Sequence, residues 1–310
     1  MFKFEEILGN NPQAGEVPGM NFCRGKKSTI PRKHYLLQYL LVIGTFARNS
    51  FIREMIFRAN FLLETLASTV WVVANIGFYL LVFYYTPSIG ASTGWGRFEF
   101  FTFLATSLII NSIVHTVFMP NADQLSERIR TGALDFVLVK PVDAQLLVSF
   151  ERLDLSSVGN FIVGVLLLGY SLCQLGWKFE LIPAFLYLFY VGCGVAILYS
   201  LMFSLAATTV WLGRNQTLYD FWFYLTTFGR YPMEIYRGRL GTPLGILFTY
   251  VIPILLVVNV PVRFLVQPLR PRQWEHWLLP LFAAAVTLAS LWICRRVFRA
   301  AIEAYRSASS

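Results

Sequence analysis

The amino-acid sequence predicts an all-α polytopic membrane protein with six transmembrane helices. Three values lead to this fold class: 56% of the 310 residues are hydrophobic, 14% are charged, and the mean hydropathy is +0.57. A soluble domain carries about 25% charged residues and about 45–50% apolar ones. Because one membrane-spanning helix needs about 20 apolar residues, the chain has room for several spans in one domain. The same composition excludes disordered, collagen-like and coiled-coil proteins.

The charged residues, cysteines and histidines narrow the class further. The net charge of +9 comes from Lys and Arg residues that flank apolar segments, a pattern typical of the cytoplasmic side of a membrane protein, and it disfavours nucleic-acid binding. The four cysteines occur singly without a CxxC pair, which argues against a zinc or redox site. The three histidines lie far apart and neither HExxH nor GxSxG occurs, which disfavours an intramembrane enzyme. We therefore expect no catalytic residue, cofactor or metal in this chain.

The first 33 residues differ from the rest of the chain. They are polar, without periodicity, and lack the apolar core of a signal peptide, so they predict a flexible cytoplasmic arm. Gly19, Gly25, Lys26 and Ser28 approach the phosphate-binding pattern GxxxxGK[ST], but the spacing is one residue too long and no strand precedes it. The sequence therefore predicts a basic loop and no nucleotide site.

A helical pattern covers residues 34–64, ahead of the first span. Apolar side chains recur on one arc and polar ones on the other at helical spacing. The apolar arc consists of Phe51, Ile52, Met55, Ile56 and Ala59. Such a helix either lies in the membrane interface with its apolar face down or packs on another part of the protein.

Apolar runs place the spans along the remaining chain. Five of them, each bounded by Pro, Gly or charged residues, cover residues 62–84, 98–119, 156–175, 181–212 and 276–295. Between residues 216 and 266 a basic Pro/Gly turn and further prolines interrupt the apolar pattern. This region contains an aromatic half-span at 219–228 and a Pro-interrupted apolar run at 244–265, and it predicts one crossing plus a broken, re-entrant segment.

The distribution of Lys and Arg predicts the orientation. Assigning the N-terminal arm, residues 119–155, residues 213–239 and the C-terminal tail to the cytoplasm places 21 of the 26 basic residues inside. Both termini are therefore expected on the cytoplasmic side. An earlier crossing would put Arg237 and Arg239 outside, which weakens the asymmetry without reversing it.

Small residues recur at every fourth position of the fourth span. They are Gly192, Ala196, Ser200, Ser204 and Thr208. Small residues at this spacing let two helix backbones approach closely inside a membrane. The stripe therefore predicts a helix–helix interface on this face of the span.

A short capped helix is expected between the second and third spans. Pro120 stops the span, Asn121 is expected to cap the helix with Gln124 in the capping-box position, and Gly132 ends it. Leu125 and Ile129 form an apolar ridge one turn apart. The charged residues beside that ridge are Asp123, Glu127, Arg128 and Arg130. Together with the apolar run at 133–141, this pattern is typical of a docking element, whereas a solvated connector would account for the charges alone.

The same stretch carries a family resemblance. QLSERIRTGALDFVLVKPV, residues 124–142, resembles the signature loop of permease subunits of type-2 ATP-binding cassette (ABC-2) transporters, in the family whose loop reads RxGxLDFxLxKPV. Further stretches agree: RANFL before the first span, FMPN after the second, GRYP and IY near residues 229–236, YVIP at 250–253, and the ending YRSASS. The resemblance covers about residues 35–310.

The resemblance implies a six-span permease domain over residues 34–310 without ATPase activity, an exporter in the bacterial cytoplasmic (inner) membrane. It implies a separate ATPase subunit holding ATP and Mg²⁺, and a second permease subunit, as a homodimer or, favoured, a heterodimer. The loop would be a coupling helix that contacts the ATPase through Leu125, Glu127, Arg128, Ile129 and Arg130. Residues 51–58 would match the family's connecting helix, and residues 243–261 its short re-entrant helices at the outer face.

An alternative function is a membrane channel or scaffold without ATP coupling, which would be purified without any nucleotide-binding subunit. The polar residues of the spans favour no single substrate class among lipids, drugs, peptides and glycans.

Overall fold

The computed structural model describes residues 32–56, 58–89, 95–140, 143–213, 226–236, 241–266 and 274–308. The chain divides into two units after Leu40, and everything below concerns the second unit, Leu41–Ser310. Within the described ranges all regular structure is helical. The predicted N-terminal arm lies outside the described residues up to position 31.

Among the described residues, five helices are long and apolar enough to cross a membrane. They are α2 (Arg58–Tyr85), α3 (Arg97–Val117) with its continuation α4 (Met119–Thr131), α7 (Val158–Gln174), α8 (Leu181–Ala207) with α9 (Thr209–Leu212), and α13 (Leu278–Ala308). A bent pair, Gly241–Val251 and Ile254–Leu265, turns by 85° and raises the number of candidate spans to 6 if it counts as one. The aromatic half-span at 219–228 lies mostly outside the described residues. The helices fit a polytopic membrane protein.

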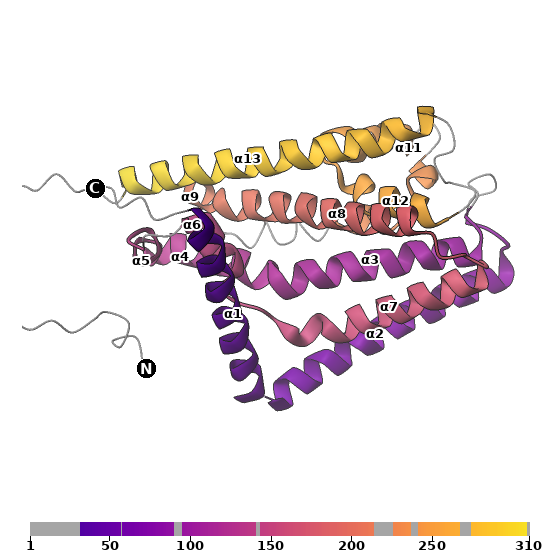
Figure 1. Ribbon diagram of the computed structural model, residues 1–310, viewed down its shortest axis with the longest axis horizontal. Helices are drawn as coiled ribbons and strands as arrows, with labels where there is room; N and C mark the ends of the chain where they lie inside the picture. Colours follow the sequence, from indigo (N-terminus) through magenta and orange to yellow (C-terminus); the bar gives the residue numbers. More distant parts are fainter. Residues whose placement is uncertain are drawn as a thin grey trace, which may run out of the picture. The chain divides into compact units, whose positions relative to one another are not determined.

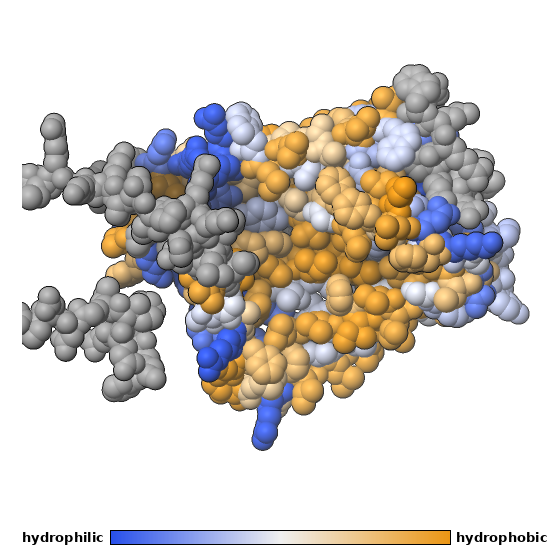
Figure 2. All heavy atoms as spheres, in the orientation of Figure 1, coloured by the Kyte–Doolittle hydropathy of each residue, from blue (hydrophilic) through white to orange (hydrophobic). Residues whose placement is uncertain are grey.

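Helix α3 is the best-covered span. About 61% of its apolar window is buried, against 11% for α2 and for α7. Helix α7 packs along α3, and α2 packs along α7, while α8 contacts α3, α12 (Ile254–Leu265) and α13 (Figure 1). Hydrophobic residues cover the middle of the face seen in Figure 2, and hydrophilic ones gather toward its ends. This zoning is what a bilayer requires, because its core offers no partner for polar groups.

Helix α1 (Arg32–Ile56) reaches the second unit with its residues from 41 onward. Its apolar arc is exposed at Phe51, Ile52, Met55 and Ile56. On the opposite side Ser50 Oγ accepts a hydrogen bond from the Leu153 amide (3.0 Å), and Arg53 donates to the Leu153 carbonyl (3.3 Å). An amphipathic helix forms as predicted, with its polar side on the chain and its apolar side outward, but it ends at Ile56 instead of continuing to residue 64, and Ala59 of the predicted arc belongs to α2.

The Pro-interrupted run forms the bent pair. It consists of α11 (Gly241–Ile246), the π-helical turn η4 (Leu247–Val251) and α12. Ile252 is extended and Pro253 precedes α12, and the residue before a proline is biased away from helical geometry. All of α12 except Arg263 is buried. The bend therefore inserts a short helix into the protein beside α8 and α3.

One sequence prediction about sidedness is wrong. The segment at 226–236, with η3 (Met233–Tyr236), lies at the end where α3 begins: Trp95, two residues before α3, donates from Nε1 to Glu234 (2.8 Å). Helices α4, α5 (Asp135–Leu138) and α6 (Ala144–Phe150) lie at the opposite end (Figure 1). The chain therefore changes ends between Gly213 and Glu234, earlier than predicted. Arg230 then lies on the side opposite to the predicted cytoplasmic segments, which weakens the asymmetric distribution of Lys and Arg without reversing it.

Candidate functional site

The segment after α3 folds into a small unit, here the α4–α6 module, comprising residues 119–140 and 143–154. Helix α4 begins at Met119, and Pro120 occupies its first turn, where a missing N–H costs little. Gly132 ends α4 with a left-handed φ of 76°, a conformation that favours glycine. The helix and its glycine stop agree with the sequence prediction.

Asn121 does not cap α4 as predicted. Residue 118 precedes the helix without a side-chain cap, and Asn121 is fully buried inside the first turn. Its Nδ2 donates to the carbonyls of Val117 (2.6 Å) and Arg152 (2.7 Å), and its Oδ1 accepts from the Arg152 amide (2.9 Å). The amide thus supplies a donor to a helix-end carbonyl of α3, which has no partner of its own within a helix. It fastens the end of the module to α3.

The Leu125–Ile129 ridge also lies differently from the prediction. Leu125 is 0% exposed and Ile129 is partly buried, and both pack in the core of this same chain. On the same helix Ser126 receives a hydrogen bond from Thr209 of α9 (3.3 Å). The ridge therefore holds α4 on the spans, because burying apolar side chains here is favourable even without a partner protein.

The charged residues of α4 fall into two groups. Arg128 forms a bidentate pair with Glu151, with Nη1–Oε2 at 2.6 Å and Nη2–Oε1 at 2.8 Å. Burial alone would raise the pKa of Glu151, but the hydrogen bonds and charge of Arg128 hold that pKa below its ordinary value. Glu127 and Arg130, by contrast, pair with each other in the open, at 2.5 Å. Arg128 is therefore an internal brace, and the Glu127–Arg130 pair lies on the surface.

The apolar run after α4 is divided between core and surface. Leu134 and Val137 are buried, whereas Phe136 is 79% and Val139 is 85% exposed. The sequence predicts that this apolar run forms part of a docking element, but it does not indicate which side chains face outward. Phe136 and Val139, here the outward pair, are the apolar surface of the module, which also exposes Glu127 and Arg130.

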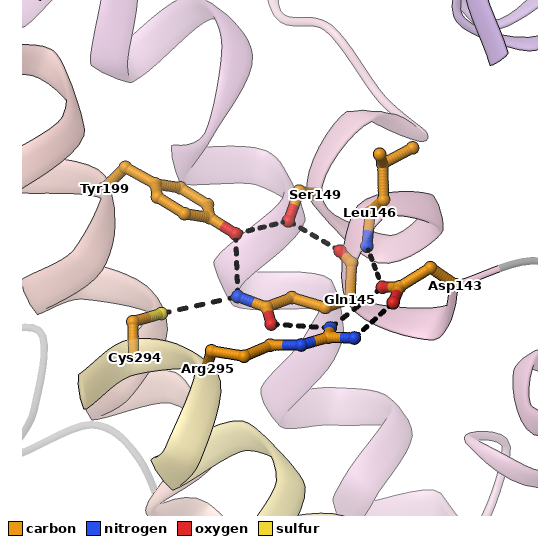
Figure 3. Close-up of polar contacts among 7 residues, drawn as sticks. All are labelled: Asp143, Gln145, Leu146, Ser149, Tyr199, Cys294 and Arg295. Carbon is orange, nitrogen blue, oxygen red and sulfur yellow. Dashed lines mark hydrogen bonds and ion pairs between the residues drawn. The ribbon is translucent and has the colours of Figure 1, made fainter. Parts of the chain in front are cut away.

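A hydrogen-bonded cluster connects α6 to two spans (Figure 3). Asp143 caps α6 by accepting from the Leu146 amide (3.1 Å), and it forms a bidentate pair with Arg295 of α13, one contact of which is 2.9 Å. Arg295 also donates to Gln145 Oε1 (2.9 Å). The pKa of Asp143 lies below its usual value, mainly because Arg295 donates hydrogen bonds to the carboxylate. Burial has a smaller effect in the opposite direction.

The cluster continues to α8 through an amide and two hydroxyls. Gln145 Nε2 donates to the Tyr199 hydroxyl (3.2 Å), which also exchanges a 2.8 Å hydrogen bond with Ser149 Oγ. Cys294 of α13 accepts a long contact from Gln145 (3.5 Å). No sequence pattern predicts this cluster, because its members come from positions far apart in the chain that match no motif.

A family model described as ABC-2 family transporter protein matches residues 69–309. The chain belongs to the ABC-2 transporter family. It is thus a multi-pass permease subunit of a transporter, in a class that works with ATP-binding subunits. No curated protein and no solved structure matches the chain.

In this ABC-2 permease the small-residue stripe of α8 is buried only in part. Ser200 is 2% exposed and donates to the Ala196 carbonyl (2.7 Å), while Gly192 is exposed with open space around it. Ser204 and Thr208 are partly exposed. A close approach lies off the stripe, where a Cβ added to Gly194 would be 2.8 Å from the Val257 carbonyl oxygen of α12.

Proposed function

We propose that this chain is the permease half of an ABC-2 exporter in the bacterial cytoplasmic membrane, with both termini in the cytoplasm. Six spans follow if a crossing lies between Gly213 and Glu234, with the bent pair re-entering from the outer side. The chain itself hydrolyses no ATP: a separate subunit holds ATP and Mg²⁺. A second permease subunit, in a heterodimer, completes the transport path. Family membership supports the transporter class, and the basic asymmetry supports the orientation.

The observation that carries the coupling part of the proposal is the outward pair, Phe136 and Val139. Both are exposed on a module rich in charges, and charges such as Glu127 and Arg130 are costly inside a bilayer. The module therefore belongs in water. Exposed aromatic and aliphatic side chains with charged neighbours are typical of protein interfaces. The ATPase subunit docks on this surface, and the exposed charges of α4 select that partner more than they add affinity.

This surface revises the contact set that the family resemblance implies. Glu127 and Arg130 stay in it, Ile129 lies at its margin, Arg128 braces the module, and Leu125 supports it from within. An aspartate at Leu125 would therefore test folding instead of docking. Helix α1 has its exposed apolar arc on the side away from Leu153, and it lies in the membrane interface with that arc in the lipid.

Co-purification tests the proposal. The tagged permease is isolated from its native membranes in mild detergent, and associated proteins are identified and assayed for ATP hydrolysis. We expect an ATPase subunit with the wild type and its loss, by about tenfold or more, with the double variant Phe136→Asp/Val139→Asp, since two charges then replace the apolar contact. Phe179→Asp is the matched control, because Phe179 is equally exposed at 75% but lies between α7 and α8 at the opposite end.

Two results contradict the proposal. Full retention of the ATPase by the double variant places docking elsewhere. A wild-type complex that contains no nucleotide-binding protein favours the channel or scaffold function.

A further inference from the structure

The module reaches the spans by two kinds of connection. Helix α4 continues directly from α3 and packs on α8, so its attachment is made by backbone and buried apolar side chains. Helix α6 packs its backbone on α4 and α5 and reaches α8 and α13 through side chains. Leu147 and Val148 of α6 are buried in the shared core. The polar side chains that link α6 to α8 and α13, here named the α6 clasp, are Asp143, Gln145, Ser149, Tyr199 and Arg295.

We infer that the α6 clasp is the positioning device by which a displacement of the α4–α6 module is passed to α8 and α13. This inference rests on the proposed function, because it assumes that an ATPase moves the module. Asp143 and Arg295 are separated by 152 residues in sequence, so their pairing joins elements that no short loop connects.

The residue types in the clasp fix both the separation and the relative orientation of the helices that they connect. A guanidinium meets a carboxylate through two parallel hydrogen bonds, which fixes the relative orientation of the two groups. Gln145 then accepts from Arg295 and donates to Tyr199, so one amide links α13 to α8. Asp143 also caps α6, which ties the pair to the axis of that helix.

The exposure of the pair separates this role from mere stabilisation of the fold. The side chains of Arg295 and Asp143 are 36% and 35% exposed, so water can replace either partner when the other is removed. Partly exposed ion pairs contribute little to folding stability. A variant that breaks the clasp is therefore expected to fold, insert and bind its ATPase, and to lose only the transmitted movement.

The experiment measures movement at the far end of α13 in the complete complex, without knowledge of the substrate. Nitroxide labels replace Leu281, near the start of α13, and Tyr85, at the end of α2, in a background in which serine replaces the native cysteines. Both label sites are exposed, at 62% and 75%. The distance between the labels is measured by pulsed electron resonance before and after addition of ATP and vanadate.

In the protein with an intact clasp we expect ATP to change the distance between the labels. Either Arg295→Gln or Asp143→Asn should reduce that change by at least half. The double variant should lose no more than either single variant, because both remove one interaction. Arg295→Lys, which keeps the charge but lacks the two-pronged geometry, should restore part of the change. The matched control is Arg299→Gln, one turn further along α13 at an exposed position.

The outcomes separate this inference from the proposed function. A wild-type distance change in Arg295→Gln overturns the role of the clasp and leaves the proposed function intact. Loss of the ATPase subunit from Arg295→Gln also overturns it, because the clasp would then maintain structure instead of transmitting movement. If the labelled wild type purifies without an ATPase, the proposed function itself fails, and the inference fails with it.

Discussion

The two ends of this permease are each held by an arginine–carboxylate pair, and the pairs differ in their access to water. At the α4–α6 end the side chains of Arg295 and Asp143 are 36% and 35% exposed. At the opposite end those of Arg263 and Glu234 are 23% and 4% exposed, and Glu234 also accepts a hydrogen bond from the fully buried Trp95. A buried charge is tolerated only with its partners in place, whereas an exposed pair can open cheaply. The Arg263–Glu234 pair is therefore a fixed joint. The Arg295–Asp143 pair, unlike the less exposed Arg128–Glu151 pair within the module, is an adjustable one.

The fixed joint gathers three segments that are distant in sequence. Glu234 belongs to η3, Arg263 to the last turn of α12, and Trp95 to the entry of α3. The amide of Met233 adds a hydrogen bond to Asn259 Oδ1 in α12 (2.9 Å). The bent pair is therefore anchored where it leaves the protein interior. Under the proposed function, movement that enters at the α4–α6 end acts against this fixed opposite end.

The largest expected effect tests this contrast directly. Glu234→Gln removes one charge of the buried pair and leaves Arg263 uncompensated, which is expected to cost about 3–5 kcal/mol of the free energy of unfolding. Asp143→Asn, the corresponding change at the other end, is expected to cost about 1 kcal/mol or less. Thermal unfolding of both purified variants in detergent measures the difference. Equal losses would show that the two joints do not differ.

A smaller loss is expected from Asn121→Ala. The substitution deprives the Val117 carbonyl and both backbone groups of Arg152 of their side-chain partner. An unsatisfied buried polar group costs about 1–3 kcal/mol, so we expect a destabilisation of about 2–3 kcal/mol. Limited proteolysis should show earlier cleavage of residues 119–154 than in the wild type. Proteolysis at the wild-type rate would mean that Asn121 is not what fastens the module.

Asn121 also shows where sequence reasoning stops. The length of an apolar run and the positions of Pro and Gly can be read directly from the sequence. They therefore predicted the apolar helices, the end of α4 at Gly132 and the break at Pro253. Which face of a helix is buried depends on neighbours elsewhere in the chain. Leu125 and Asn121 were therefore assigned to the surface and to a cap, when both in fact face the core.

The polar joints were beyond the reach of the sequence for the same reason. Glu234 meets Trp95 across 139 positions, and Asp143 meets Arg295 across 152. No spacing rule covers such distances. The distribution of basic residues predicts an orientation, but it could not locate the change of ends between Gly213 and Glu234.

A matched pair of glycines probes the packing between the two ends. Gly194→Ala places a methyl group 2.8 Å from the Val257 carbonyl oxygen, which forces α8 and α12 apart and is expected to cost about 1–2 kcal/mol. Gly192→Ala, on the same helix, meets nothing within 4 Å and should be neutral or slightly stabilising, because alanine favours helix. Thermal unfolding of the two variants checks this. A similar loss for both would indicate a helix-wide effect and not a local close approach.

The smallest expected effect is a pH dependence confined to the adjustable joint. Hydrogen bonds from Arg295 hold the pKa of Asp143 below its ordinary value of 3.8 in the folded protein. Because the folded-state pKa is the lower one, the stability that the pair contributes is complete above the unfolded-state value and is lost as the pH falls through the folded-state value. Solvent screening limits this contribution to about 1 kcal/mol or less.

The measurement compares the unfolding temperatures of the wild type and Asp143→Asn over a range from about pH 7 to about pH 3. The gap between them should stay constant down to about pH 5 and close below about pH 4, since the wild-type carboxyl then becomes neutral as well. Added salt should narrow the gap at neutral pH, because exposed pairs are screened. A gap that instead closes between about pH 7 and pH 5 would mean that a group other than Asp143 controls this end of the permease.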